Sequence, residues 1–114
     1  MDCIFCRIAT GEIPATIIAR SNGALAFRDL SPQAPTHVLV IPIGHVDSAA
    51  DLLPDDRAAV LGDVMALAVQ VAADEGLVAG GYRLVINTGA DGGQSVGHLH
   101  VHLLGGRQMK WPPG

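Results

Sequence analysis

The sequence predicts an α+β domain with a mainly antiparallel sheet, on three observations. Five short apolar segments are typical of strands, one longer segment is apolar at helical spacing, and Asn22-Gly23, a common hairpin turn, joins the first two strand segments. The resulting order is a helical turn, a hairpin, a strand, a long helix and two strands. This order disfavours a doubly wound nucleotide-binding fold, in which strands and helices alternate.

The first half of the chain is expected to supply a short helix and three strands. The segment "CIFCRIATG" (3–11) predicts a helical turn, and "ATIIARS" (15–21) with "GALAFRD" (23–29) predicts the hairpin. After a loop framed by prolines, "HVLVI" (37–41) predicts a buried strand that ends before Pro42.

The second half begins with the longest element, a helix expected over residues 54–75, roughly five turns. A proline and two aspartates suit its first turn, and Gly76 suits its C-terminal cap. "GYRLVIN" (81–87) and "HLHVHLL" (98–104) then predict two strands, separated by the glycine-rich loop "TGADGGQSVG" (88–97).

The long helix is apolar over more than one face, whereas a sheet can cover only one. Such a helix predicts a second subunit as its remaining cover, through a two-fold interface. The alternative is a helix whose exposed alanines cost little. The apolar positions are Val60, Leu61, Val64, Met65, Leu67, Ala68, Val69 and Val71.

Composition and charge narrow the classes of function. With 114 residues, 49% hydrophobic and 16% charged, the chain is expected to fold as one domain over residues 1–114. The net charge of −4 disfavours nucleic acid as a partner. No apolar run suits a membrane span and Met1 begins no signal peptide, so a cytoplasmic location is expected. There, the C-x-x-C of Cys3 and Cys6 indicates metal or redox use.

Three of the five histidines, His98, His100 and His102, alternate along the last predicted strand. Alternate residues share one face of a strand, so the three imidazoles would line one face and the leucines and valine the other. Positions i and i+4 of a strand lie roughly 13 Å apart, so two of these imidazoles can share a metal ion but three cannot.

An anion is the other candidate to meet these imidazoles. The preceding loop has glycines whose backbone N–H groups can converge on phosphate oxygens, and Gln94 and Ser95 add side-chain donors. An imidazole with a pKa of about 6.5 is largely neutral at pH 7 and can attack phosphorus. His100, flanked by the other two histidines, is the best-placed nucleophile.

These residues resemble the histidine triad superfamily over essentially the whole chain. "FRDLSPQAPTHVLVIP", "NTGADGGQSVGHLHVHLLGGRQ" and the final "WPPG" closely resemble its histidine triad nucleotide-binding (Hint) branch. The resemblance implies a five-stranded sheet that continues across a homodimer, with the tail, residues 105–114, at the interface. It implies hydrolysis of the P–N bond of adenosine 5′-phosphoramidates, and hydrolysis of the related aminoacyl adenylates, with purine nucleotides and nucleoside phosphoramidates as ligands.

The resemblance also implies roles for individual residues. His100 would form a covalent nucleotidyl-histidine, His102 would contact the α-phosphate, His37 would line the site, and His98 would orient His100 through a hydrogen bond from His100 to a backbone carbonyl. The expected nucleotide contacts are Asn87, Gly93, Gln94 and Ser95 at the phosphate and leaving group, Asp29 at the ribose, Phe27 and Leu30 at the base, and Trp111 in the tail. Plainer roles stay open: a turn cap for Asp29, core for Phe27 and Leu30, loop support for Asn87, and packing for Trp111.

The N-terminal C-x-x-C departs from animal members of the family and resembles bacterial relatives that hold zinc. The resemblance makes Cys3, Cys6, His45 and His98 the ligands of a structural Zn²⁺ ion, with no cofactor required for the chemistry. Gly97 stands where aromatic residues are common in the family.

Three rival functions remain open. A metal-dependent hydrolase would use zinc to activate water. A nucleotide-binding regulatory module would turn over slowly. A dinucleoside polyphosphate hydrolase would use the same superfamily chemistry on another substrate.

Overall fold

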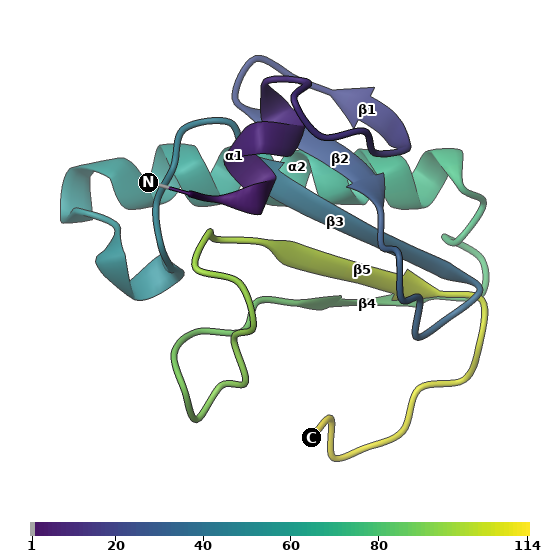
Figure 1. Cartoon of the computed structure of the whole chain (residues 1–114). Helices are drawn as coiled ribbons and strands as arrows, with labels where there is room; N and C mark the ends of the chain where they lie inside the picture. The colour runs from purple at the N-terminus through teal and green to yellow at the C-terminus, as the bar shows by residue number, and fades with distance from the viewer. Residues whose placement is uncertain (1) are drawn as a thin grey trace.

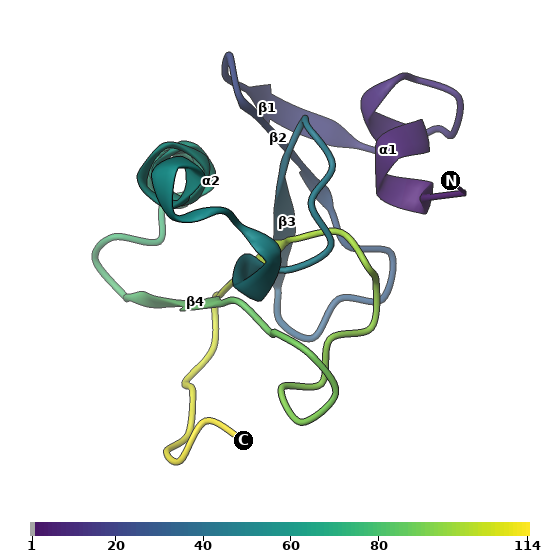
Figure 2. The same cartoon turned by 90° about the vertical axis from the view of Figure 1, so that its left-hand side faces the viewer.

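A five-stranded antiparallel sheet lies between two helices of unequal length. The computed structural model describes residues 2–114. The strand order is β1-β2-β3-β5-β4, with every neighbouring pair antiparallel. Figures 1 and 2 show the long helix α2 on one side of the sheet and the short helix α1 on the other. The helices are α1 (Ile4–Ala9) and α2 (Arg57–Asp74), and the strands are β1 (Ile17–Arg20), β2 (Ala24–Arg28), β3 (Thr36–Pro42), β4 (Tyr82–Val85) and β5 (Val101–Gly105). The predicted fold class is confirmed.

Both faces of the central strands are buried. On β2, Ala24 and Ala26 pack in the core beneath α2, whereas Leu25 and Phe27 pack beneath α1. β3 alternates in the same way. Val38 and Val40 belong to the core beneath α2, and Leu39 and Ile41 belong to the core beneath α1. Because both faces are covered, residues 24–27 of β2 and residues 38–41 of β3 are uninterrupted apolar runs.

The long helix differs from its prediction at its first turn. Residues 54–56 form a separate 3-10 turn, closed by a hydrogen bond of 2.9 Å from Asp56 N to Leu53 O, and the α-helix begins at Arg57. Such tighter turns are frequent at helix N-termini. Its end is as predicted: Gly76 has φ of +75°, and Leu77 N donates to Ala72 O at 2.9 Å, which is a Schellman cap.

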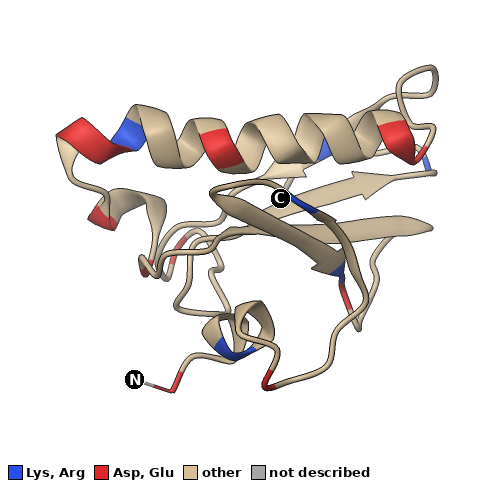
Figure 3. Cartoon of the chain, turned by 90° about the horizontal axis from the view of Figure 1, so that it is seen from above, with Lys and Arg blue, Asp and Glu red and all other residues tan. Residues whose placement is uncertain are grey.

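Only one face of α2 is covered within the chain. Val64, Leu67, Ala68 and Val71 are buried against the sheet. The outward positions are mostly alanine, glycine and charged residues, and Val69 is the large apolar side chain left 49% exposed. Figure 3 shows acidic residues at intervals along α2 and the turn before it. The outer face is therefore less apolar than the sequence pattern suggested, and the predicted dimer stays a prediction.

The last strand begins later than predicted. β5 starts at Val101 rather than at residue 98, so His98 and His100 precede the strand, and the expectation of three histidines on one strand is corrected. The neighbouring Pro42 has no N–H for the ladder and its carbonyl accepts from the His98 ring, while Leu99 N donates to Val46 O at 2.8 Å. The backbone before Val101 thus pairs with the loop after β3.

None of the described helices, which lie within residues 2–114, is long and apolar enough to cross a membrane.

Candidate active site and metal centre

A pocket of about 280 Å³ opens between α1, the end of β2 and the histidine run. His100 and His102 line one side, and Ser95 lies beside them. Apolar side chains from α1, including Phe5, line the opposite side and were not anticipated as site residues. The only sequence signal for them was the apolar character of "CIFCRIA". The predicted site residues lining the pocket are Phe27, Asp29, Leu30, Ser95, His100 and His102.

His100 is held in one tautomer by the backbone. Its ring is 3% exposed, and its Nδ1 lies 2.8 Å from the carbonyl oxygen of His98. A carbonyl oxygen only accepts, so Nδ1 carries the proton and Nε2 keeps its lone pair. The ring of Phe5 packs against it edge-on, with centroids 5.3 Å apart. The expected hydrogen bond is therefore present, and it leaves a nucleophilic nitrogen on His100.

His37 and His102 meet across the β3–β5 ladder, on which His37 is paired with Leu104 and His102 with Leu39. The His37 Nε2 and His102 Nδ1 atoms lie 2.9 Å apart. Burial, followed by the neighbouring imidazoles of His100 and His37, lowers the pKa of His102 to about 4, against the opposing effect of the Asp29 carboxylate. Burial also lowers the pKa of His37, against the opposing effect of the Asp29 carboxylate. Both rings are neutral at pH 7.

Asp29 caps a turn and also lines the pocket, and its contact with a ribose stays a prediction. Its Oδ1 accepts from the backbone N–H of Ser31 at 2.7 Å, as a turn cap does, and its Oδ2 lies 3.4 Å from His37 Nε2. The turn therefore fixes a carboxylate at the pocket edge.

Gln94 supports the glycine-rich loop from within. Its side-chain amide donates to Asp47 O at 2.6 Å and to Val96 O at 2.9 Å, and its Oε1 accepts from Gly89 N at 3.0 Å. Because both amide hydrogens are engaged, the side chain has none left for the predicted phosphate contact. The N–H of Gly93 is likewise used inside the loop, on Ala90 O at 3.0 Å.

The remaining predicted contacts divide between core and surface. Phe27 is 3% exposed and packs edge-on against Phe5, whereas Leu30 is 93% exposed at the pocket rim. Asn87 follows β4 and is not among the residues lining the pocket. Trp111 is 83% exposed, on a tail that leaves β5 and runs away from both helices (Figure 1). Within one chain, the tail contributes nothing to the pocket.

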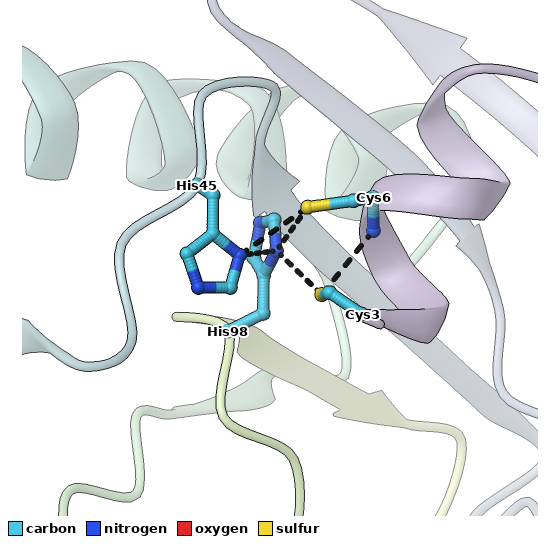
Figure 4. A group of neighbouring side chains, drawn as sticks. All are labelled: Cys3, Cys6, His45 and His98. Carbon is cyan, nitrogen blue, oxygen red and sulfur yellow. Dashed lines mark hydrogen bonds between the residues drawn. The ribbon is translucent and has the colours of Figure 1, made fainter. Parts of the chain in front are cut away.

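Cys3, Cys6, His45 and His98 converge from α1, the loop after β3 and the segment before β5 (Figure 4). Cys3 Sγ lies 3.3 Å from His98 Nδ1, Cys6 Sγ lies 3.2 Å from His45 Nδ1, and the two Nδ1 atoms are 3.1 Å apart. Ligands at the corners of a tetrahedral zinc site are separated by about 3.3–3.8 Å. The four residues can hold a metal ion.

The protonation of the two imidazoles tests this fit. His98 Nε2 donates to Pro42 O at 2.9 Å, and His45 Nε2 donates to Asp47 Oδ1 at 2.6 Å. In its neutral form each ring therefore has a lone pair on Nδ1, and the two Nδ1 atoms face each other and the two sulfur atoms. Two facing lone pairs repel unless a cation lies between them, so the donor set suits a metal ion. Asp47, which fixes the His45 ring, was not predicted.

Comparisons with known proteins agree with this geometry. Residues 10–109 match the model of the HIT domain family. The chain is 50% identical, over 99% of its length, to an uncharacterised HIT-like protein of Synechococcus elongatus, covering 97% of that protein. It is 50% identical to a 14 kDa zinc-binding protein of Zea mays, covering 97% of this chain and 87% of that protein.

Among solved structures, a HIT family hydrolase from Legionella pneumophila Philadelphia 1 superposes with a TM-score of 0.94 at 52% identity, covering 99% of this chain and 100% of that one. A histidine triad nucleotide-binding protein from Candida albicans superposes with a TM-score of 0.80 at 30% identity, covering 97% of this chain and 83% of that one. The family match spans most of the chain and includes His37, His45 and the histidine run. The chain belongs to the histidine triad (HIT) family.

Proposed function

We propose that this HIT protein is a hydrolase that cleaves the P–N bond of purine nucleoside 5′-phosphoramidates, adenosine 5′-phosphoramidates above all, and the P–O bond to the acyl group of aminoacyl adenylates. An adenosine substrate releases AMP and a guanosine substrate releases GMP. The observation that carries the proposal is the tautomer of His100, whose Nε2 lone pair is held ready by the hydrogen bond to His98 O. The similarity to proteins described as hydrolases and as nucleotide-binding supports it.

The reaction proceeds in two displacements at phosphorus. His100 Nε2 attacks phosphorus, the P–N bond breaks, and the amine leaves with a proton taken from solvent water. Water then attacks the nucleotidyl-histidine, the new P–N bond breaks, and the mononucleotide leaves as His100 is regenerated. The base lies among the apolar side chains contributed by α1 and Phe27, and Asp29 accepts from the ribose hydroxyls.

The four-residue metal centre holds a structural Zn²⁺ ion in this proposal. A set of two thiolates and two imidazoles closes a tetrahedral site and leaves no open position for water. The similarity to a plant protein described as zinc-binding supports the choice of metal. The ion supplies cohesion between α1 and the segment before β5, and no step of the reaction passes through it.

The active protein is proposed to be a homodimer. β4 is an edge strand that pairs only with β5, and all four of its residues are half-buried. A second copy pairing along this edge would continue the sheet and cover the outer face of α2. The exposed tail, with Trp111, would then reach the partner.

Trapping of the intermediate tests the function. Adenosine 5′-phosphoramidate labelled in the α-phosphate is mixed with the protein, and the reaction is stopped within milliseconds by alkaline denaturant, in which phosphohistidine bonds survive. We expect label on the protein, mapped to the peptide containing His100, and none on His100→Ala.

The rival functions predict different results in the same experiment. A metal-dependent hydrolase would turn over without labelling the protein and would lose activity on chelation. A regulatory module would bind nucleotide and show neither label nor turnover. A dinucleoside polyphosphate hydrolase would label from a diadenosine polyphosphate faster than from the phosphoramidate.

A further inference from the structure

We propose that the backbone amide of Gln33 and the ring of His37 form a relay that fixes His102 as the Nε2–H tautomer. His102 then faces the pocket as a hydrogen-bond donor beside His100, which carries a lone pair at the same ring position. His37 is in this view a positioning residue rather than a catalytic one.

The relay begins at a group that cannot change its protonation. The backbone N–H of Gln33 donates to His37 Nδ1 at 3.0 Å. A peptide amide only donates, so Nδ1 of His37 has no proton and the single proton of the neutral ring is on Nε2. The ring is 5% exposed, which also favours its neutral form.

The tautomer of His37 in turn determines that of His102. His37 Nε2–H lies 2.9 Å from His102 Nδ1, a normal hydrogen-bond distance. His37 is the donor, so His102 Nδ1 is the acceptor and the proton of the neutral His102 ring is on Nε2. Among residues 2–114, no group hydrogen-bonds to that Nε2, and the ring lines the pocket.

A metal ion is the competing explanation for this cluster. The ligand atoms of Asp29, His37 and His102 lie within 4.8 Å of one another, as those of the four-residue metal centre do. The two clusters differ in protonation: His45 and His98 have bare lone pairs facing each other, whereas His37 presents an N–H. A protonated nitrogen cannot bind a metal, so the short His37–His102 contact is a hydrogen bond.

The loop that carries the Gln33 amide is braced. Arg107 Nε donates to Gln33 O at 2.9 Å, and the Gln33 side chain donates to Ser31 O at 3.0 Å. Asp29 holds the other side of the loop through Ser31 N. These contacts restrict the peptide that sets the tautomer of His37.

The inference has a functional consequence that rests on the proposed function. Attack by His100 on phosphorus shifts negative charge onto the non-bridging oxygens and the leaving nitrogen. An N–H donor fixed beforehand at His102 stabilises such charge without reorganisation. One neighbouring ring thus attacks while the other donates, because the two rings differ in which nitrogen carries the proton.

NMR of protein with ¹⁵N-labelled histidine tests the relay without any turnover. In the wild type at about pH 7, we expect a protonated Nε2 and an unprotonated Nδ1 on His102. Gln33→Pro removes the backbone N–H, and Gln33→Ala keeps it. Gln33→Ala should retain the tautomer, whereas Gln33→Pro should give His102 a mixture of both forms.

His37→Phe keeps a ring of similar size and removes both nitrogens, so it tests the relay should Gln33→Pro not fold. We expect mixed tautomers on His102 and a kcat on the phosphoramidate roughly tenfold to hundredfold lower, with little change in AMP affinity. A His102 proton on Nδ1 in the wild type, or an unchanged tautomer in His37→Phe, would overturn the inference. A wild-type protein that shows the expected His102 tautomer but does not hydrolyse the phosphoramidate would instead overturn the proposed function.

Discussion

At the scale of single residues, the chemistry of this protein depends on where each imidazole carries its proton. A different group fixes the tautomer of each of the five histidines, and for four of them this group is a backbone atom or a carboxylate. For this reason His100 presents a lone pair on Nε2, whereas His102 is proposed to present a proton on Nε2. The chemistry of the site therefore depends on the tautomer of each ring more than on the number of histidines.

The first prediction concerns the nucleophile. His100→Ala should lower turnover of adenosine 5′-phosphoramidate at least roughly a thousandfold, because no other ring presents a free Nε2 lone pair to the pocket. AMP binding, measured by calorimetry, should persist because most of the pocket lining is unchanged. Gln70→Ala, on the exposed side of α2, is the control. Near-normal turnover by His100→Ala would refute covalent catalysis.

The second prediction concerns acid stability. The pKa of His102 is about 4 in the folded protein and about 6.5 in the unfolded chain, so above pH 6.5 both states are neutral and the full contribution to stability is present. Below that, the unfolded chain binds the proton first, and stability is lost as pH falls toward 4. Urea unfolding should show wild type losing stability relative to His102→Gln between about pH 7 and pH 4.5. A constant difference between the two proteins would contradict the low pKa.

At the scale of elements, α1 is too short to be stable alone. It has six residues, and its apolar side chains Phe5 and Ile8 are buried against β2 and β3. Cys3, at its N-cap, and Cys6, within it, join it to the segment that precedes β5. The pocket wall formed by α1 depends on both the apolar contacts and the metal centre.

The third prediction concerns the contribution of the metal centre to the stability of α1. Protein purified without a histidine tag should contain about one zinc ion per chain, and Cys3→Ser combined with Cys6→Ser should lose it and melt at least about 5 °C lower. A strong chelator should lower the melting temperature of the wild type and leave that of the double variant unchanged. A metal-free wild type with chelator-insensitive melting would refute the zinc site.

At the scale of the whole molecule, the monomer leaves three features of the described chain exposed. The β4 edge of the sheet is unpaired on its outer side, and Val69 on α2 is half exposed. The tail carries Trp111 into solvent, where an indole gains no burial. A second copy of the chain accounts for all three.

The fourth prediction tests that assembly. Sedimentation at micromolar concentration should give a dimer, and Val69→Asp should weaken it by placing a charge in the interface. Val78→Asp is the matched control, because Val78 is 67% exposed in the loop after α2. A monomeric wild type would remove the basis for a shared interface.

The fifth prediction assigns a role to the tail. Deleting residues 108–114 should change the relative rates for different amine leaving groups more than it changes AMP affinity, because Trp111 would lie near the partner's pocket. Competition between two phosphoramidates that differ only in their amine measures this ranking. An unchanged ranking in a dimeric deletion variant would refute the role.

The sequence by itself determined the fold class, the order of the elements and the types of residue at the site. Apolar periodicity and hairpin residues are local signals, and they located all five strands and the long helix to within a few residues. The C-x-x-C and the alternating histidines are local as well. The chemistry expected of them follows from residue type, because thiolates bind metal ions and neutral imidazoles can attack phosphorus.

Only the tertiary structure decided which of those residues belong to the metal centre and which belong to the pocket. Cys3 and His98 are 95 positions apart, and their meeting depends on the packing of α1. Gln94 became a brace rather than a phosphate donor because Asp47 and Val96 present carbonyls to it. The run of histidines divides between a metal centre and a pocket because Pro42 cannot continue the ladder and its carbonyl takes the His98 ring. The tautomers of His37, His98 and His100 are set by backbone atoms of distant or neighbouring residues, and the pattern of side chains in the sequence does not reveal these contacts.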